Sequence, residues 1–67
     1  MSYLVGEEVL DFGDKVIIRW PDRTITKAVF KDSVGYSHYF MSDDDKEIRL
    51  TNHFMRLKGI HLKKDEE

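Results

Sequence analysis

Three histidines are the first side chains of this sequence that could hold a metal. His38, His53 and His61 follow no known spacing of zinc ligands. The chain has no cysteine that could complete a zinc site. The sequence therefore predicts no metal centre at the histidines.

The acidic run Asp43-Asp44-Asp45-Lys46-Glu47 has the carboxylate density of a calcium loop but not its pattern. An EF-hand loop needs glycine at its sixth position and glutamate at its twelfth. Counted from Asp43, those positions hold Ile48 and Phe54. A solvated hairpin turn is the better interpretation of this run.

Nucleophilic catalysis has no support either. A catalytic serine needs a base that is itself oriented by a third group, and Ser33, Ser37 and Ser42 lie in no such motif. The four glycines are scattered and form no phosphate-binding loop. We therefore expect a protein that is not an enzyme and that uses no cofactor.

The elements that must position these side chains begin with a hairpin. Residues 15–20 alternate, which predicts a strand with Val16, Ile18 and Trp20 on one face. Pro21-Asp22 predicts a tight turn, because proline presets the backbone angle at the first corner.

Three further strands are expected. Residues 24–31 pair with the first strand, with Ala28 and Phe30 inward because the alternating lysines need water. Residues 36–41 and 47–50 form the third and fourth strands.

A short helical turn and a last strand complete the pattern. Thr51-Asn52 predicts a helix start and Gly59 a helix end, with Phe54 and Leu57 on a shared face. Residues 60–63 predict a fifth strand.

Short strands joined by tight turns predict one mainly β domain over residues 1–67. We expect a five-stranded SH3-like or Tudor-like barrel, ordered over about residues 8–64, with an acidic tail at 65–67 that frays. Closure would remove exposed strand edges and let the apolar side chains enclose one core.

Charge is distributed unevenly along a chain whose net charge is −2. Residues 7–14 carry four acids and no base, whereas residues 15–31 carry five bases against one acid. Residues 46–64 are again basic. A solvated surface of mixed sign and a basic face that the net charge conceals are both consistent with this pattern.

The order of several motifs resembles the Tudor-like small β-barrel modules. The motifs are GDKV, then Trp-Pro-Asp, KAVF, YFMSDDDKEIRL and GIHL, and they span roughly residues 13–62. The chain is also similar to small bacterial and phage proteins with a V-x-V-R-W-P-D-G core. The resemblance implies a binding module.

In Tudor domains an aromatic cage holds methylated lysine or arginine by cation–π contact. The resemblance places Trp20 at the first cage position, Tyr39 at a second and Asp44 where a polar residue contacts the ligand. The chain departs from the family at two cage positions, which fall near Ile25 and Ser42. The turn also has Arg23 where the family favours glycine.

Two candidate surfaces follow. Trp20, at a strand end, is either a core residue or part of an aromatic rim with Tyr36, Tyr39 and Asp44. The second surface is the outer side of the hairpin over residues 15–31, where exposed apolar residues are flanked by bases. Its basic members are Arg19, Arg23, Lys27 and Lys31.

These surfaces favour a non-catalytic interaction module that binds a protein partner. The alternatives are nucleic-acid binding through the same bases, a phage-encoded or mobile-element-encoded inhibitor of a host protein, and contact with a second copy of the chain. The N-terminal MSYLVGEEVLDF has no basic leader and no membrane-spanning run is present, so we expect a soluble cytoplasmic protein.

Overall fold

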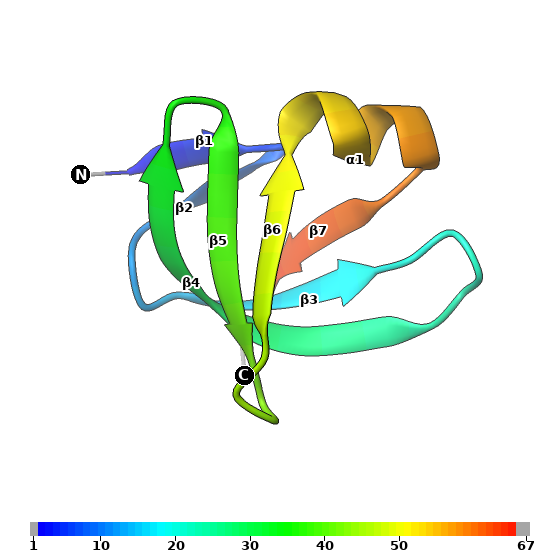
Figure 1. Cartoon of the computed structure of the whole chain (residues 1–67), viewed down its shortest axis with the longest axis horizontal. Helices are drawn as coiled ribbons and strands as arrows, with labels where there is room; N and C mark the ends of the chain where they lie inside the picture. The colour runs from blue at the N-terminus through cyan, green and yellow to red at the C-terminus, as the bar shows by residue number, and fades with distance from the viewer. Residues whose placement is uncertain (1, 66–67) are drawn as a thin grey trace.

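The computed structural model describes residues 2–65, and these form seven strands and one helix (Figure 1). The elements are β1 (Tyr3–Val5), β2 (Glu8–Leu10), β3 (Lys15–Arg19), β4 (Ile25–Val34), β5 (Ser37–Ser42), β6 (Glu47–Thr51), α1 (Asn52–Lys58) and β7 (His61–Lys64). The prediction of a mainly β fold with one short helix before the last strand is confirmed.

The five strands predicted from the sequence form one antiparallel sheet in the order β6-β5-β4-β3-β7. The last strand lies beside β3, so Ile18 is opposite both Thr26 on β4 and Leu62 on β7. The predicted alternation also holds, because Val16 and Ile18 on β3 and Ala28 and Phe30 on β4 are all buried.

A bulge in β4 bends this sheet. The register of β4 against β5 shifts between Phe30 and Asp32, and such a bulge bends and twists its strand. The first part of β4 therefore lies beside β3, whereas its second part turns upward beside the antiparallel β5 in Figure 1. The core lies inside this bend.

The sheet is not closed into a barrel by hydrogen bonds within residues 2–65. β6 and β7 are its two edges, and β6 pairs only with β5 while β7 pairs only with β3. The predicted closed barrel is therefore not formed within these residues. The five predicted strands form a bent open sheet instead.

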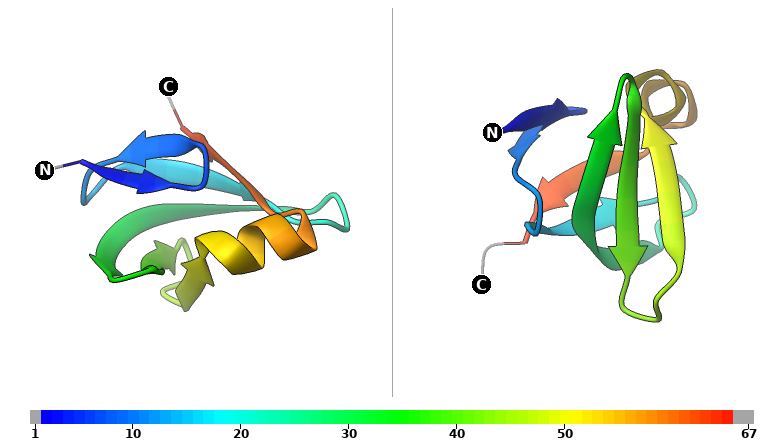
Figure 2. Two further views of the ribbon diagram at one scale, coloured as in Figure 1. Left: turned by 90° about the horizontal axis from the view of Figure 1, so that it is seen from above. Right: turned by 60° about the vertical axis from the view of Figure 1, so that its left-hand side comes forward.

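An N-terminal hairpin, which the sequence did not predict, fills the open side of the bend. β1 and β2 pair as a separate two-stranded sheet. Val5 and Leu10 are fully buried, and Tyr3 and Phe12 lie against Phe30 with ring centroids at 6.0 and 5.4 Å. The hairpin lies across the molecule from β5 and β6 (Figure 2). The ordered structure therefore starts well before residue 8.

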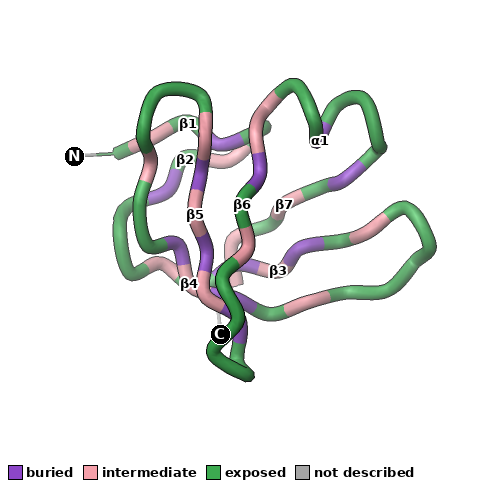
Figure 3. The backbone as a smooth tube through the Cα atoms, in the orientation of Figure 1, coloured by how far each residue is buried: buried purple, intermediate pink, exposed green. Residues whose placement is uncertain are grey.

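Figure 3 shows buried segments along facing parts of the strands and exposed segments at the turns. Phe30 lies at the centre of the core, and its ring is 5.4 Å from that of Phe40. Met55 and Ile60 close the core beneath the helix and the start of β7. One core therefore joins both sheets and the helix.

The helix begins and ends where the sequence predicts. The Thr51 side chain accepts a 3.0 Å hydrogen bond from the Phe54 amide, and Gly59 ends the helix with a φ of 73°. Phe54 and Leu57, for which the sequence predicts a shared face, are both exposed, and Met55 is the buried residue of the helix. Seven residues are too few to show a helical period.

The Asp65 amide donates a 2.9 Å hydrogen bond to the Lys15 carbonyl, so the first residue of the acidic tail contacts the start of β3. The predicted fraying of residues 66 and 67 lies outside the described residues.

Candidate binding surface

The side of β7, β3 and β4 that faces away from the core carries two rows of side chains. In the first row Lys63, Ile17 and Lys27 lie side by side on the three strands. In the second row His61, Arg19 and Ile25 lie side by side. The rows are largely uncovered within the described residues, because five of the six side chains are exposed and Ile17 is half-buried.

This basic outer face, as we call the two rows, combines positive charge with apolar area. Lys27, Arg19 and Lys63 are all exposed, and neither row contains an acid. Ile25 is 58% exposed and Ile17 is half-buried. Two isoleucines therefore lie among cationic side chains, each directly opposite a base on the neighbouring strand.

β7 contributes two members that the sequence reading missed. Lys63 and His61 reach this surface only because β7 pairs with β3. The alternation of His61 and Lys63 with Ile60 and Leu62 was the available signal. The sequence pattern does not indicate which strand pairs with residues 61–64.

Only two of the four bases predicted for the hairpin lie in the rows. Arg19 and Lys27 are diagonal neighbours across the β3–β4 ladder. Arg23 lies in the turn beyond Arg19. Lys31 lies at the bulge, at the far end of the hairpin.

The β3–β4 turn holds Arg23 in a strained conformation. Its φ is 72°, in the left-handed region that favours glycine. The Arg23 amide donates to the Trp20 carbonyl and the Trp20 amide to the Thr24 carbonyl. Asp22 accepts from the hydroxyl and amide of Thr24, and these two bonds lower the pKa of its carboxyl.

Trp20 lies on the core side of the sheet. It is half-buried and packs against the core cluster. Its indole N–H donates a 2.8 Å hydrogen bond to Thr26 Oγ1. Both the apolar ring and its polar atom therefore already have partners within the fold.

The structure does not bring the predicted aromatic rim together. Tyr36 lies in the β4–β5 turn with 86% of its surface exposed, at the other end of β4 from Trp20. Tyr39 lies on the outer face of β5, opposite Asp32 and Arg49. Trp20 and Tyr39 therefore lie on opposite faces of the sheet.

Asp44 belongs to the β5–β6 turn rather than to a rim. Its carboxylate accepts a hydrogen bond from the Ser42 hydroxyl and lies 3.6 Å from the Lys46 ammonium. The Ser42 hydrogen bond is the main cause that lowers the pKa of Asp44. These contacts are those of a locally stabilised turn.

A shallow hollow lies where the bulge meets β5. Lys31 lines it together with Tyr39 and Met41, and its volume is about 380 Å³. Lys31, predicted for the hairpin surface, and Tyr39, predicted for the aromatic rim, therefore lie close together at this hollow. It opens on the same outer side of the sheet as the two rows.

A buried group of hydrogen-bonded polar side chains lies on the core side of the sheet. His38 is 3% exposed, and its Nδ1 lies 2.9 Å from Ser33 Oγ. Its Nε2 lies 3.2 Å from Asn52 Oδ1, which also accepts the Gly6 amide at 2.9 Å. Burial lowers the pKa of His38, and the Asn52 contact offsets this effect in part.

Residues 2–65 contain no group of three or more potential metal-binding side chains. In the same range no helix has the length and apolarity to cross a membrane. The fold and the surface together define a small antiparallel β domain with an uncovered basic sheet face.

Comparison with known proteins adds no relative to this description. No family model matches the chain, no curated protein is significantly similar in sequence, and no solved structure is significantly similar in fold.

Proposed function

We propose that the chain is a non-catalytic interaction module whose basic outer face binds an acidic surface of a partner protein. The observation that carries the proposal is the pair of rows Lys63–Ile17–Lys27 and His61–Arg19–Ile25, which contain bases and apolar side chains but no acid. An acidic partner would complement this charge.

The two isoleucines of the rows favour a protein partner. Ile17 and Ile25 offer area that a partner could remove from water, at about 25 cal/mol per Å² of apolar surface. The surrounding lysine and arginine side chains would form the polar rim of such an interface. Phosphate groups alone would leave the isoleucines uncovered.

The strand order supports an SH3-like class of module. A meander of four strands, then a short helix, then a last strand beside the first is the order that a small SH3-like barrel requires. We do not extend the proposal to a methylated ligand, because Trp20 and Tyr39 lie on opposite faces.

Amide shifts in an NMR titration test the proposal. The probe is a glutamate-rich peptide with interspersed leucines, and an otherwise identical peptide with glutamine in place of glutamate is the ligand control. We expect shifts at the amides of Ile17, Arg19, Lys27 and Lys63 with the acidic peptide alone. Equal binding of both peptides would contradict the proposal that the acidic charge of the partner is recognised.

Charge-reversed variants add a matched test. Lys27→Glu changes the charge within the rows, whereas Lys58→Glu makes the same change on α1, outside them. The proposal requires Lys27→Glu to weaken binding about tenfold or more and Lys58→Glu to weaken it less than about threefold. Equal losses would show an effect of net charge.

Single-stranded nucleic acid is a second candidate, and the absence of acids from the rows is what favours it. Phosphate binding releases counterions, so affinity would fall by about 0.7 log units per neutralised phosphate for each log unit of salt. A steep slope with an oligothymidine, and no binding of the acidic peptide, would favour this candidate over the first.

A further inference from the structure

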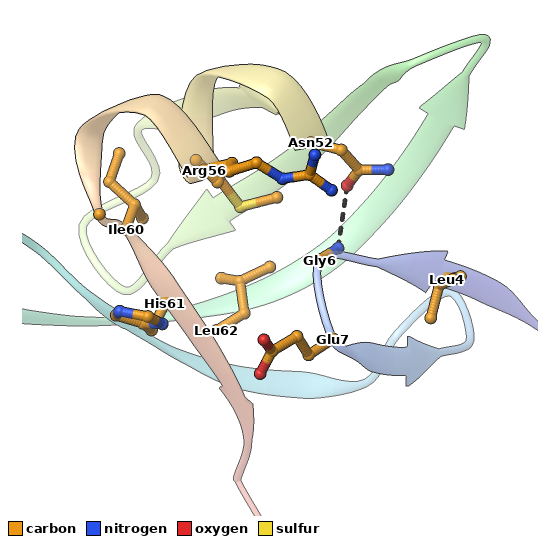
Figure 4. Close-up of a pocket in the computed structure, with 10 residues that line it drawn as sticks. Leu4, Gly6, Glu7, Asn52, Arg56, Ile60, His61 and Leu62 are labelled. Carbon is orange, nitrogen blue, oxygen red and sulfur yellow. Dashed lines mark hydrogen bonds between the residues drawn. The ribbon is translucent and has the colours of Figure 1, made fainter.

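A groove separates the N-terminal hairpin from the helix and β7. Its volume is about 350 Å³, and it lies between the β1–β2 turn, α1 and the start of β7 (Figure 4). This size is near the lower end of the range of about 300–1,000 Å³ typical of small-molecule sites. The groove therefore has room for a ligand of amino-acid or dipeptide size.

The lining of the groove is apolar between its charged walls. Leu4, Met55, Ile60 and Leu62 contribute to it. Met55 and Ile60 are buried and Leu62 is half-buried, so this apolar part belongs to the core. It would accept an aliphatic group.

Two opposite charges line the same groove. Arg56 reaches it from α1, and Glu7 reaches it from the β1–β2 turn. In Figure 4 the guanidinium lies near the Asn52–Gly6 hydrogen bond, and the Glu7 carboxylate extends on the other side of Leu62. Within residues 2–65 neither side chain has an ion-pair or hydrogen-bond partner.

The wall that carries Glu7 is held in place. Asn52 Oδ1 accepts the Gly6 amide at 2.9 Å and lies 3.2 Å from buried His38 Nε2. Because Asn52 is also the first residue of α1, this contact fixes the hairpin turn relative to the helix that carries Arg56. The backbone segments that carry Glu7 and Arg56 are therefore held in a fixed position relative to each other.

We infer that the groove binds a small zwitterion with an aliphatic side chain, of the size of an amino acid or dipeptide. The carboxylate of the ligand pairs with the Arg56 guanidinium, which can donate two parallel hydrogen bonds. The ammonium pairs with Glu7, and the aliphatic group lies on Leu62 and Met55. This inference does not depend on the function proposed for the basic outer face.

The test is a comparison of ligands that differ in one charge. L-leucine is titrated beside 4-methylpentanoate, which lacks the ammonium, and isoamylamine, which lacks the carboxylate. Leucylglycine is the dipeptide probe. We expect shifts at the Gly6, Glu7, Arg56 and Leu62 amides, and at least about threefold weaker binding of both single-charge analogues. No binding of leucine or leucylglycine, or equal binding of all four probes, would overturn the inference.

Variants separate a specific site from general affinity. Glu7→Gln should weaken binding of leucine but leave binding of 4-methylpentanoate unchanged, whereas Arg56→Gln should weaken binding of both. Lys58→Gln, on the same helix but outside the groove lining, is the control and should change neither. An unchanged amide spectrum outside the groove verifies that each variant is folded. Equal effects of Arg56→Gln and Lys58→Gln would contradict the assignment.

Discussion

The indole nitrogen of Trp20 donates a 2.8 Å hydrogen bond to Thr26 Oγ1 across the β3–β4 turn. The ring also packs against the core. The only tryptophan of the chain therefore stabilises the end of the hairpin.

Thr26→Val should lower the free energy of unfolding by about 1 kcal/mol, because the indole N–H loses its partner while the side-chain shape is kept. Urea unfolding followed by tryptophan fluorescence measures this change. The same substitution is also made in the Trp20→Phe variant, where unfolding is followed by circular dichroism. There Thr26→Val should lower the free energy of unfolding by less, because the hydrogen bond is already absent. Equal costs in the two backgrounds would show that the hydrogen bond does not contribute.

Arg23→Gly should raise the free energy of unfolding by about 0.5–1 kcal/mol. Arg23 has a φ of 72°, which costs a residue with a side chain about 1–2 kcal/mol, and the entropy of glycine offsets part of the gain. Thermal unfolding measures the shift. Arg19→Gly, within β3, is the control and should destabilise the domain; a loss of stability in both variants would contradict the prediction.

Stability should decrease as the pH falls below about 6.5. Burial lowers the pKa of His38, so near and below its ordinary value the unfolded chain binds a proton that the folded chain does not. Because the unfolded state then holds more protons, the free energy of unfolding decreases as pH falls. Urea unfolding between neutral and mildly acidic pH measures this dependence.

The histidine variants identify the group responsible. His38→Gln should remove much of the pH dependence, whereas His53→Gln, at an exposed position on α1, should retain it. A slope that survives in His38→Gln would assign the effect to another group.

Phe30→Ala should unfold the domain or nearly so, because Phe30 is fully buried and lies against three aromatic rings and His38. Such a truncation costs about 3–5 kcal/mol. Tyr36→Ala removes an aromatic ring that is 86% exposed and should change stability by less than about 0.5 kcal/mol. Circular dichroism of the two variants measures the contrast, and similar unfolding midpoints would contradict the assignment of the core.

The strands with clear alternation could be predicted from the sequence. Val16, Ile18, Ala28 and Phe30 all face the core, as their spacing of two indicates. The β4–β5 turn was placed too early, because the pattern predicts the end of the second strand at residue 31. The strand continues through a bulge to Val34, and a bulge needs no proline or glycine to mark it.

The N-terminal hairpin and the binding surface required the tertiary structure. Strands of three residues, such as Tyr3–Val5, are too short to show a period. Trp20 and Tyr39 are not brought together because they lie on opposite faces of the sheet, and the sequence does not define the packing that decides this. The two rows of the basic outer face depend on the pairing of β7 with β3. These strands are far apart in the sequence, so local patterns do not predict the pairing.

The central claim is that the basic outer face binds an acidic protein surface. Amide shifts on adding the glutamate-rich peptide test it most directly, with the Lys27→Glu and Lys58→Glu variants beside the wild type. The account predicts shifts concentrated at Ile17, Arg19, Lys27 and Lys63 that Lys27→Glu largely abolishes and Lys58→Glu preserves. Shifts centred instead on Trp20 or Tyr36, or no shifts at all, would contradict it.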